Sequence, residues 1–121
     1  MENKVFNPER WAEIIELEES GEKGLVESLI HDYIAMCPAV LEQMQSSVDA
    51  NDLQTLERLA HSLKSSSMVM GLEFAAQAAL QIETEAREKT FTPAILIEVK
   101  ERLHVGLKEL ETFRVSRNHN V

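Results

Sequence analysis

The sequence predicts an all-α protein, and three observations carry that prediction. Glycine and proline are few, with four and three residues among 121. Strand-like runs in which β-branched or aromatic residues alternate with polar ones are absent. Apolar residues instead recur three and four positions apart, as they do on the buried face of a helix. A chain of this length is expected to form one domain around a single hydrophobic core.

The first element predicted is a short helix over residues 8–17, preceded by a polar leader over residues 1–7. Asn7-Pro8 indicates a helix start, because an N-cap acceptor is followed by proline at the first helical position. We expect this helix to be a lid over one end of a bundle, with Trp11 packed inward. A contact between Trp11 and a ligand or partner is the alternative.

A long amphipathic helix is predicted next, over residues 22–48. Pro38 lies inside it and is expected to kink or divide it near Cys37, because proline lacks an N–H and clashes with the preceding turn. Cys37 is expected to be a small core residue, since no flanking cation would lower the pKa of its thiol.

A third helix carries His61. Asn51 and Gln54 resemble a capping box that opens it, and Gly71 is expected just after its end. The helix that follows, over residues 72–88, is rich in alanine, which allows a neighbouring helix to approach closely.

The last helix is expected to start at Thr92-Pro93, again a cap followed by proline. We expect the helical domain to span residues 8–114 and residues 115–121 to form a flexible tail. The predicted fold is thus an antiparallel, up-and-down four-helix bundle with short connections and an N-terminal lid helix.

Charge and cysteine content exclude several classes of function. The net charge of −9 argues against a general nucleic-acid binder and against binding to an anionic membrane surface. The chain has one cysteine and no apolar run of signal-peptide or transmembrane length, so a cytoplasmic location is expected. We expect a monomer.

His61 is the candidate reactive residue. On the predicted helix it lies outside the apolar stripe, and Lys64 follows one turn later on the same side. The stripe consists of Leu56, Leu59, Ala60, Leu63, Ser67 and Met70. Neutral imidazole is a competent nucleophile, and Lys64 can supply a cation to a phosphoryl group. From spacing alone, an ordinary solvated histidine remains the alternative.

A wider pattern resembles the signature of histidine-containing phosphotransfer (HPt) domains of two-component phosphorelays. It consists of Ala60-His61-Ser62-Leu63-Lys64-Ser65-Ser66, then Gly71-Leu72, then Leu80-Gln81-Ile82-Glu83. The similarity covers about residues 22–113 and is that of a free-standing bacterial-type module. The family usually has glycine where this chain has Ser65. Because serine is still small, docking is expected to survive, while partner choice or rate can change.

The resemblance implies a phosphocarrier without kinase activity of its own. Nε2 of His61 would accept a phosphoryl group from the aspartyl phosphate of a response-regulator receiver domain and relay it to another receiver; a hybrid sensor kinase is a further partner class. No glycine-rich phosphate loop or magnesium motif is present. We therefore expect no resident cofactor, with Mg²⁺ supplied by the receiver.

Further site residues are expected, Glu83 from the resemblance and a docking surface from the geometry around His61. Glu83 matches a position that often carries Gln or Glu in the family, and it could accept a hydrogen bond from the imidazole and hold its tautomer; a solvated glutamate is the alternative. The expected docking surface around His61 consists of Ser65, Met68 and Leu72, rimmed by Glu57, Arg58 and Lys64. Met68 could instead fill the edge of the core, and Arg58 could be a solvated charge.

Two other functions compete with the phosphocarrier. A non-catalytic helical adaptor would keep the same helices and lose nothing on replacement of His61 by Gln. A metal-binding bundle would use Glu-x-x-His motifs, and Glu101-Arg102-Leu103-His104 has that form. A second such motif, which a two-metal site requires, does not occur in the sequence.

Overall fold

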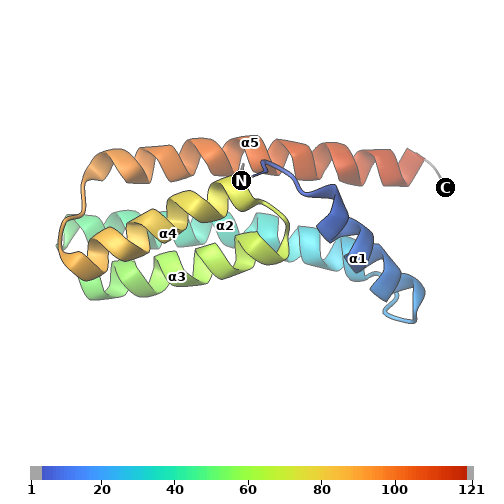
Figure 1. The fold of residues 1–121 in the computed structure, drawn as a ribbon, viewed down its shortest axis with the longest axis horizontal. Coiled ribbons are helices and arrows are strands. Elements are labelled where there is room, and N and C mark those ends of the chain that lie inside the picture. Colours follow the sequence, from blue (N-terminus) through green and yellow to red (C-terminus); the bar gives the residue numbers. More distant parts are fainter. Residues whose placement is uncertain (1–3, 120–121) are drawn as a thin grey trace.

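The computed structural model describes residues 4–119, and over this range its regular structure is entirely helical. Five helices follow one another: α1 (Pro8–Glu19), α2 (Leu25–Asp49), α3 (Leu53–Val69), α4 (Glu73–Glu88) and α5 (Pro93–His119) (Figure 1). The all-α prediction is confirmed. No helix within the described residues combines the length and the apolar composition that a membrane span requires.

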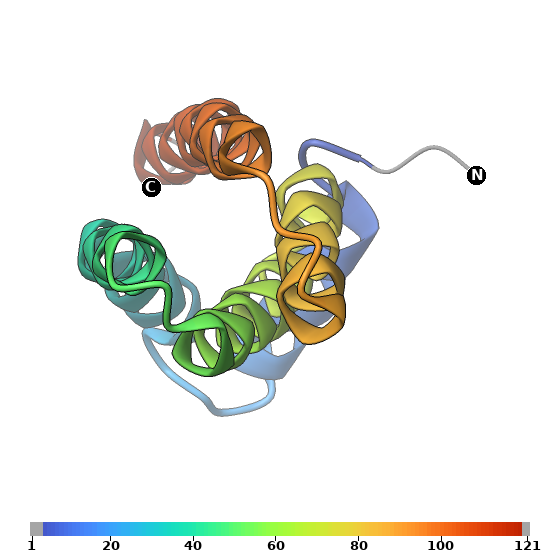
Figure 2. The ribbon, with the colours of Figure 1, turned by 90° about the vertical axis from the view of Figure 1, so that its left-hand side faces the viewer.

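Helices α2 to α5 run in alternating directions and surround a common centre (Figure 2). Each contacts the next, α2 also contacts α5, and the most extensive contact joins α3 to α4. The residues that fill the centre include Ile30, Met44, Leu56, Leu63, Ile82, Val99, Leu103 and Leu110. Alanines of α4 at positions 75, 78 and 79 are also buried, which lets α3 and α4 lie close together.

Helix α1 packs against α2 and is fastened to the turn between α3 and α4. The Asn7 side chain caps α1 by accepting hydrogen bonds from two backbone N–H groups, as predicted. Trp11 is buried, and its indole N–H donates to the carbonyl of Met70 at 2.8 Å. Its ring packs against Phe6 and Phe113. Trp11 is therefore a packing residue.

The start of α3 differs from the expectation. Asp52, not Asn51, is the N-cap, and its Oδ1 accepts a hydrogen bond from the backbone N–H of Thr55 at 3.1 Å. Asn51 instead adopts the left-handed conformation, with φ of 53°. Because asparagine tolerates this conformation well, Asn51 closes the turn after α2 and leaves the next residue to cap.

Of the two effects expected of Pro38, a kink or a division, division is wrong: α2 continues unbroken from Leu25 to Asp49. The loss of one backbone hydrogen bond is tolerated because the helix buries a continuous face on either side of it. Helix α5 extends to His119, so residues 115–119 are helical, while residues 120–121 lie outside the described range.

The extension of α5 has a physical cause. No glycine or proline follows position 106 to end the helix. Two arginines of its last turns are paired with other helices: Arg114 with Glu27 at 3.2 Å and Arg117 with Glu18 at 2.7 Å.

Gly71 is expected to be sensitive to substitution for two separable reasons. Its φ is 72°, and an added Cβ would lie 3.2 Å from atoms of Asn7 and Arg10. Gly24 has a similar φ of 74°, but a Cβ there would meet nothing within 4 Å. Gly24→Ala should therefore cost only the left-handed strain, about 1–2 kcal/mol, whereas Gly71→Ala should cost more. Urea unfolding of both variants measures this; equal losses would contradict the crowding at Gly71.

Candidate phosphotransfer site

His61 projects from the outer face of α3. The opposite face buries Leu56, Ala60, Leu63 and Ser67, so the histidine is turned toward solvent and its side chain is 59% exposed. Its Nδ1 lies 2.8 Å from Oε2 of Glu83. Because an ionised carboxylate can only accept, Nδ1 carries a hydrogen, and in the neutral imidazole Nε2 therefore keeps its lone pair. Nε2 has no hydrogen-bond partner among the described residues and is open to a reactant.

Glu83 is the buried centre of the site. It is only 5% exposed and accepts hydrogen bonds on both carboxylate oxygens. Oε2 accepts a hydrogen bond from Nδ1 of His61 and another, at 3.1 Å, from Nη2 of Arg87. Oε1 accepts one from Nζ of Lys64 at 2.8 Å. Burial by itself raises the pKa of this carboxyl, but the hydrogen bonds from Lys64 and His61 outweigh it, and the pKa of Glu83 lies below its ordinary value. The group is therefore an anion near neutral pH.

The structure thus brings His61, Lys64 and Glu83 together. Lys64 lies one turn after His61 on α3 and is partly exposed. In this arrangement its ammonium is bound to Glu83, so that the histidine and the lysine occupy the two oxygens of one carboxylate.

Arg87 is a residue of the site that sequence reasoning missed. It follows Glu83 by one turn of α4, and its Nε donates to Oε2 of Glu57 on α3 at 2.9 Å. The hydrogen bond and the charge of Glu57 raise the pKa of the guanidinium further. The i, i+4 spacing from Glu83 could have indicated this pairing, but residues 83–89 had the pattern of a solvated charged stretch.

The expected docking residues differ in their exposure to solvent. Met68 is 50% exposed, Ser65 and Arg58 are exposed, and Glu57 is partly exposed but paired with Arg87. Leu72 is the error: it is fully buried and lies against Gly106 of α5, where an added Cβ would stand 3.0 Å from Leu72 Cδ1.

Leu72 is the residue just before α4, and Gly106 of α5 leaves room for its side chain in the core. An apolar group is nevertheless present on α4 beside the site. Leu80 is 45% exposed and lines, with Met68 and Lys64, a shallow hollow between α3 and α4.

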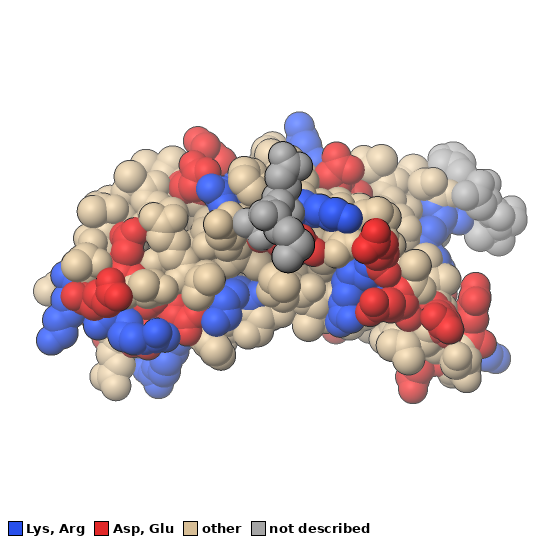
Figure 3. Space-filling view, viewed as in Figure 1, with Lys and Arg blue, Asp and Glu red and all other residues tan. Residues whose placement is uncertain are grey.

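Charged groups of both signs surround this region, although the molecule as a whole is acidic. Figure 3 shows basic and acidic side chains lying next to one another over the left-hand part of α3 and α4. Acidic side chains gather over α1 at the lower right. The carboxylates of Glu57 and Glu83 are each matched by a cation.

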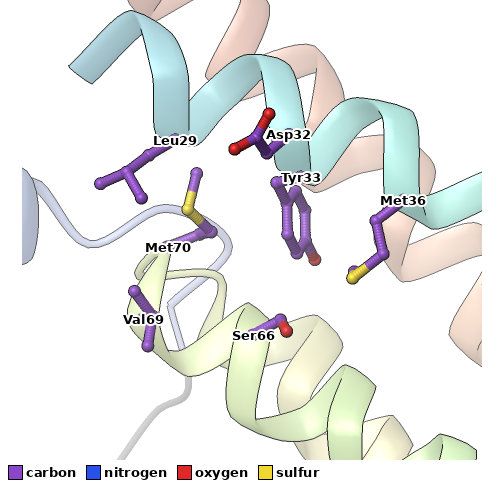
Figure 4. A pocket seen from close by; sticks show the side chains of 7 residues that line it. All are labelled: Leu29, Asp32, Tyr33, Met36, Ser66, Val69 and Met70. Atoms are coloured by element: carbon purple, nitrogen blue, oxygen red, sulfur yellow. The ribbon is translucent and has the colours of Figure 1, made fainter. Parts of the chain in front are cut away.

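A separate apolar hollow of about 220 Å³ lies between α2 and α3 and contains none of the site residues (Figure 4). Its lining residues are Leu29, Asp32, Tyr33, Met36, Ser66, Val69 and Met70. Tyr33 is buried here and its hydroxyl hydrogen-bonds to Ser67 Oγ at 2.7 Å. The volume is below the roughly 300 Å³ at which ligand pockets usually begin, and the hollow lies apart from His61.

Other reactive or metal-binding groups do not form a second site. Burial raises the pKa of the Cys37 thiol to about 11, so it is protonated at neutral pH. Glu101 and His104 are both exposed on α5. Within the part of the chain that the structure describes, no three His, Cys, Asp or Glu side chains converge as a metal site requires.

The fold and the side chains together define a small all-helical module with one solvent-accessible histidine held by a buried carboxylate. The family model described as "Hpt domain" matches residues 28–112. The chain therefore belongs to the Hpt domain family, as its sequence pattern predicts, and is a phosphotransfer module of two-component signalling.

A solved structure agrees with this assignment at the level of the fold. The chain is similar to histidine-containing phosphotransfer protein B (HptB) from Pseudomonas aeruginosa PAO1, with a TM-score of 0.82 and 20% sequence identity. The similarity covers 95% of this chain and 98% of that one. No curated protein sequence matches the chain significantly.

The pKa of Glu83 predicts a pH-dependent stability. Because the folded-state pKa is depressed, the ionised carboxylate stabilises the fold above the unfolded-state pKa, about 4.3, and this contribution is lost as the pH falls through the folded-state pKa. The difference in unfolding free energy between wild type and Glu83→Gln should therefore be largest near neutral pH and shrink in acid.

Urea unfolding over a range of pH measures this difference. Glu109→Gln, at an exposed position of α5, serves as the control and should show no such trend. A wild-type to Glu83→Gln difference that stays constant in acid would contradict the assignment.

Proposed function

We propose that the protein is a histidine phosphotransfer protein in which His61 accepts a phosphoryl group from the aspartyl phosphate of a receiver domain and relays it to another receiver. The observation that carries this proposal is the hydrogen bond from His61 Nδ1 to the buried Glu83. It leaves the lone pair on Nε2, which faces solvent and is open to a partner of protein size.

The proposed reaction balances without a cofactor bound to this chain. The Nε2 lone pair attacks phosphorus, an N–P bond forms, and the P–O bond to the donor aspartate breaks. The aspartate leaves as a carboxylate with the bonding electron pair. The imidazole, neutral before attack, becomes a positively charged ring that keeps its hydrogen on Nδ1. Glu83 accepts the hydrogen bond from Nδ1–H, and its negative charge offsets the new positive charge of the ring. Transfer to the next aspartate is the reverse step.

The remaining site residues support this chemistry by position and charge. Lys64, one turn after His61 and partly exposed, is the cation we assign to the phosphoryl oxygens on Nε2, and charge stabilisation of those oxygens is the main requirement of phosphoryl transfer. The Mg²⁺ that assists the transfer would come with the receiver.

The docking surface we propose surrounds His61 with exposed small and apolar side chains. Ser65 and Met68 belong to it, Leu80 replaces Leu72, and Arg58 and Glu57 lie at its rim. Receiver domains, alone or as part of a hybrid sensor kinase, are the partners that carry a phosphoryl group to such a surface. Serine at position 65 is small enough to let them approach.

We further propose that the protein acts as a cytoplasmic monomer. The proposed architecture is an up-and-down four-helix bundle of α2–α5, with α1 as its lid. The contacts of α1 with α2 and of Trp11 with the α3–α4 turn support the role of α1. These contacts lie outside the His61 site and leave it open.

The proposal predicts that His61 alone is labelled. A phosphorylated receiver domain, acetyl phosphate or phosphoramidate should give wild type an acid-labile, alkali-stable phosphoryl adduct, detected by mass spectrometry. His61→Gln should give none. His31→Gln, at an exposed histidine of α2, should be labelled like wild type.

Absence of an adduct on wild type from a broad panel of receivers, with all three proteins folded, would contradict the proposal. The non-catalytic adaptor would then be the better account.

A further inference from the structure

Lys64 is bound to Glu83 in the structure and is not free to act on a phosphoryl group. Its Nζ lies 2.8 Å from Oε1 of Glu83. The reacting nitrogen of His61, Nε2, is on the side of the ring that faces away from Glu83, because Nδ1 makes the contact. An ammonium that moves toward oxygens of a phosphoryl group on Nε2 therefore moves away from Oε1 of Glu83.

The departure of Lys64 would uncover a buried negative charge. Glu83 is only 5% exposed, and removing one partner from a buried ion pair is strongly unfavourable when nothing replaces it. The carboxylate would then turn, bind water, or recapture the lysine. The first two outcomes would disturb the hydrogen bond that orients His61, and the third would withdraw the lysine from the phosphoryl group.

Arg87 is the cation that stays on Glu83 when Lys64 leaves. Its Nη2 donates to Oε2 of Glu83 at 3.1 Å, while its Nε donates to Glu57 at 2.9 Å. The planar guanidinium can make both bonds at once, which the single ammonium of a lysine does less well. Glu57 lies on α3 and Glu83 on α4, so the arginine is anchored on both helices that form the site.

We propose that Arg87 is a positioning residue that releases Lys64 for phosphoryl transfer. It keeps the buried Glu83 carboxylate paired and aligned with His61 while Lys64 moves to the phosphoryl oxygens. Glu57 holds Arg87 in place for this role. This inference rests on the proposed function, and it adds an exchange of partners within the site.

The first test is a double-substitution cycle on the rate of phosphoryl acceptance. Arg87→Gln should slow acceptance on the order of tenfold, which corresponds to about 1.4 kcal/mol of transition-state free energy. In the Arg87→Gln background, Lys64 stays on Glu83, so Lys64→Gln should cost several-fold less than it does in wild type. Arg87→Lys should recover only part of the rate.

Two features make this test specific. The Arg87 side chain is largely exposed, so its replacement should leave the fold intact, which urea unfolding checks. Lys108→Gln removes the same charge from an exposed position of α5 and should leave the rate unchanged. The proposal would be overturned if Lys64→Gln slowed acceptance by the same factor in the Arg87→Gln background as in wild type.

The second test needs no phosphoryl transfer. In the unphosphorylated protein, ¹⁵N NMR of the Lys64 ammonium measures how fast its hydrogens exchange with water. With Arg87→Gln the lysine becomes the main cation on Glu83 and its exchange should slow, while Lys108→Gln should have no effect. Unchanged exchange would overturn the role of Arg87. If the Lys64 hydrogens exchange more slowly in Arg87→Gln but wild type accepts no phosphoryl group, only the phosphotransfer function is overturned.

Discussion

The site depends on the hydrogen bonds that the buried carboxylate of Glu83 accepts. One anion on α4 receives hydrogen bonds from His61 and Lys64 of α3 and from Arg87 of its own helix. Buried carboxylates are unfavourable unless they are paired, so Glu83 depends on its three donors to stay ionised. The donors in turn depend on Glu83 for their positions. The result is an imidazole with a defined tautomer on an otherwise exposed surface.

The rest of the fold serves to hold α3 and α4 at the distance this arrangement needs. Alanines at 75, 78 and 79 remove bulk between the two helices, and the left-handed Gly71 turns the chain directly from one into the other. Helix α1 then secures this turn through Trp11 and the backbone of Asn7, whose N–H donates to the Gly71 carbonyl at 2.8 Å. A short connection and a close helix pair thus position donors that lie 19 to 22 residues from Glu83 in the chain.

Much of this arrangement could be predicted from the sequence, because it is set by helix periodicity and local turn signals. The outward position of His61 and the placement of Lys64 one turn later are of that kind. What could not be predicted depends on contacts between helices. Leu72 is buried because Gly106 of α5 leaves room for it, and Glu57 of α3 lies across from Arg87 and joins it to the second helix of the site. Neither neighbour can be identified from spacing along one helix.

The most direct test of the central claim is the tautomer of His61 in the unphosphorylated protein. Long-range ¹H–¹⁵N NMR of the imidazole distinguishes a hydrogen on Nδ1 from one on Nε2. The hydrogen bond to Glu83 predicts the Nδ1–H form in wild type, near neutral pH, and a loss of that preference in Glu83→Gln. A wild-type imidazole that carries its hydrogen on Nε2 would contradict the account, because the nitrogen facing the partner would then lack its nucleophilic lone pair.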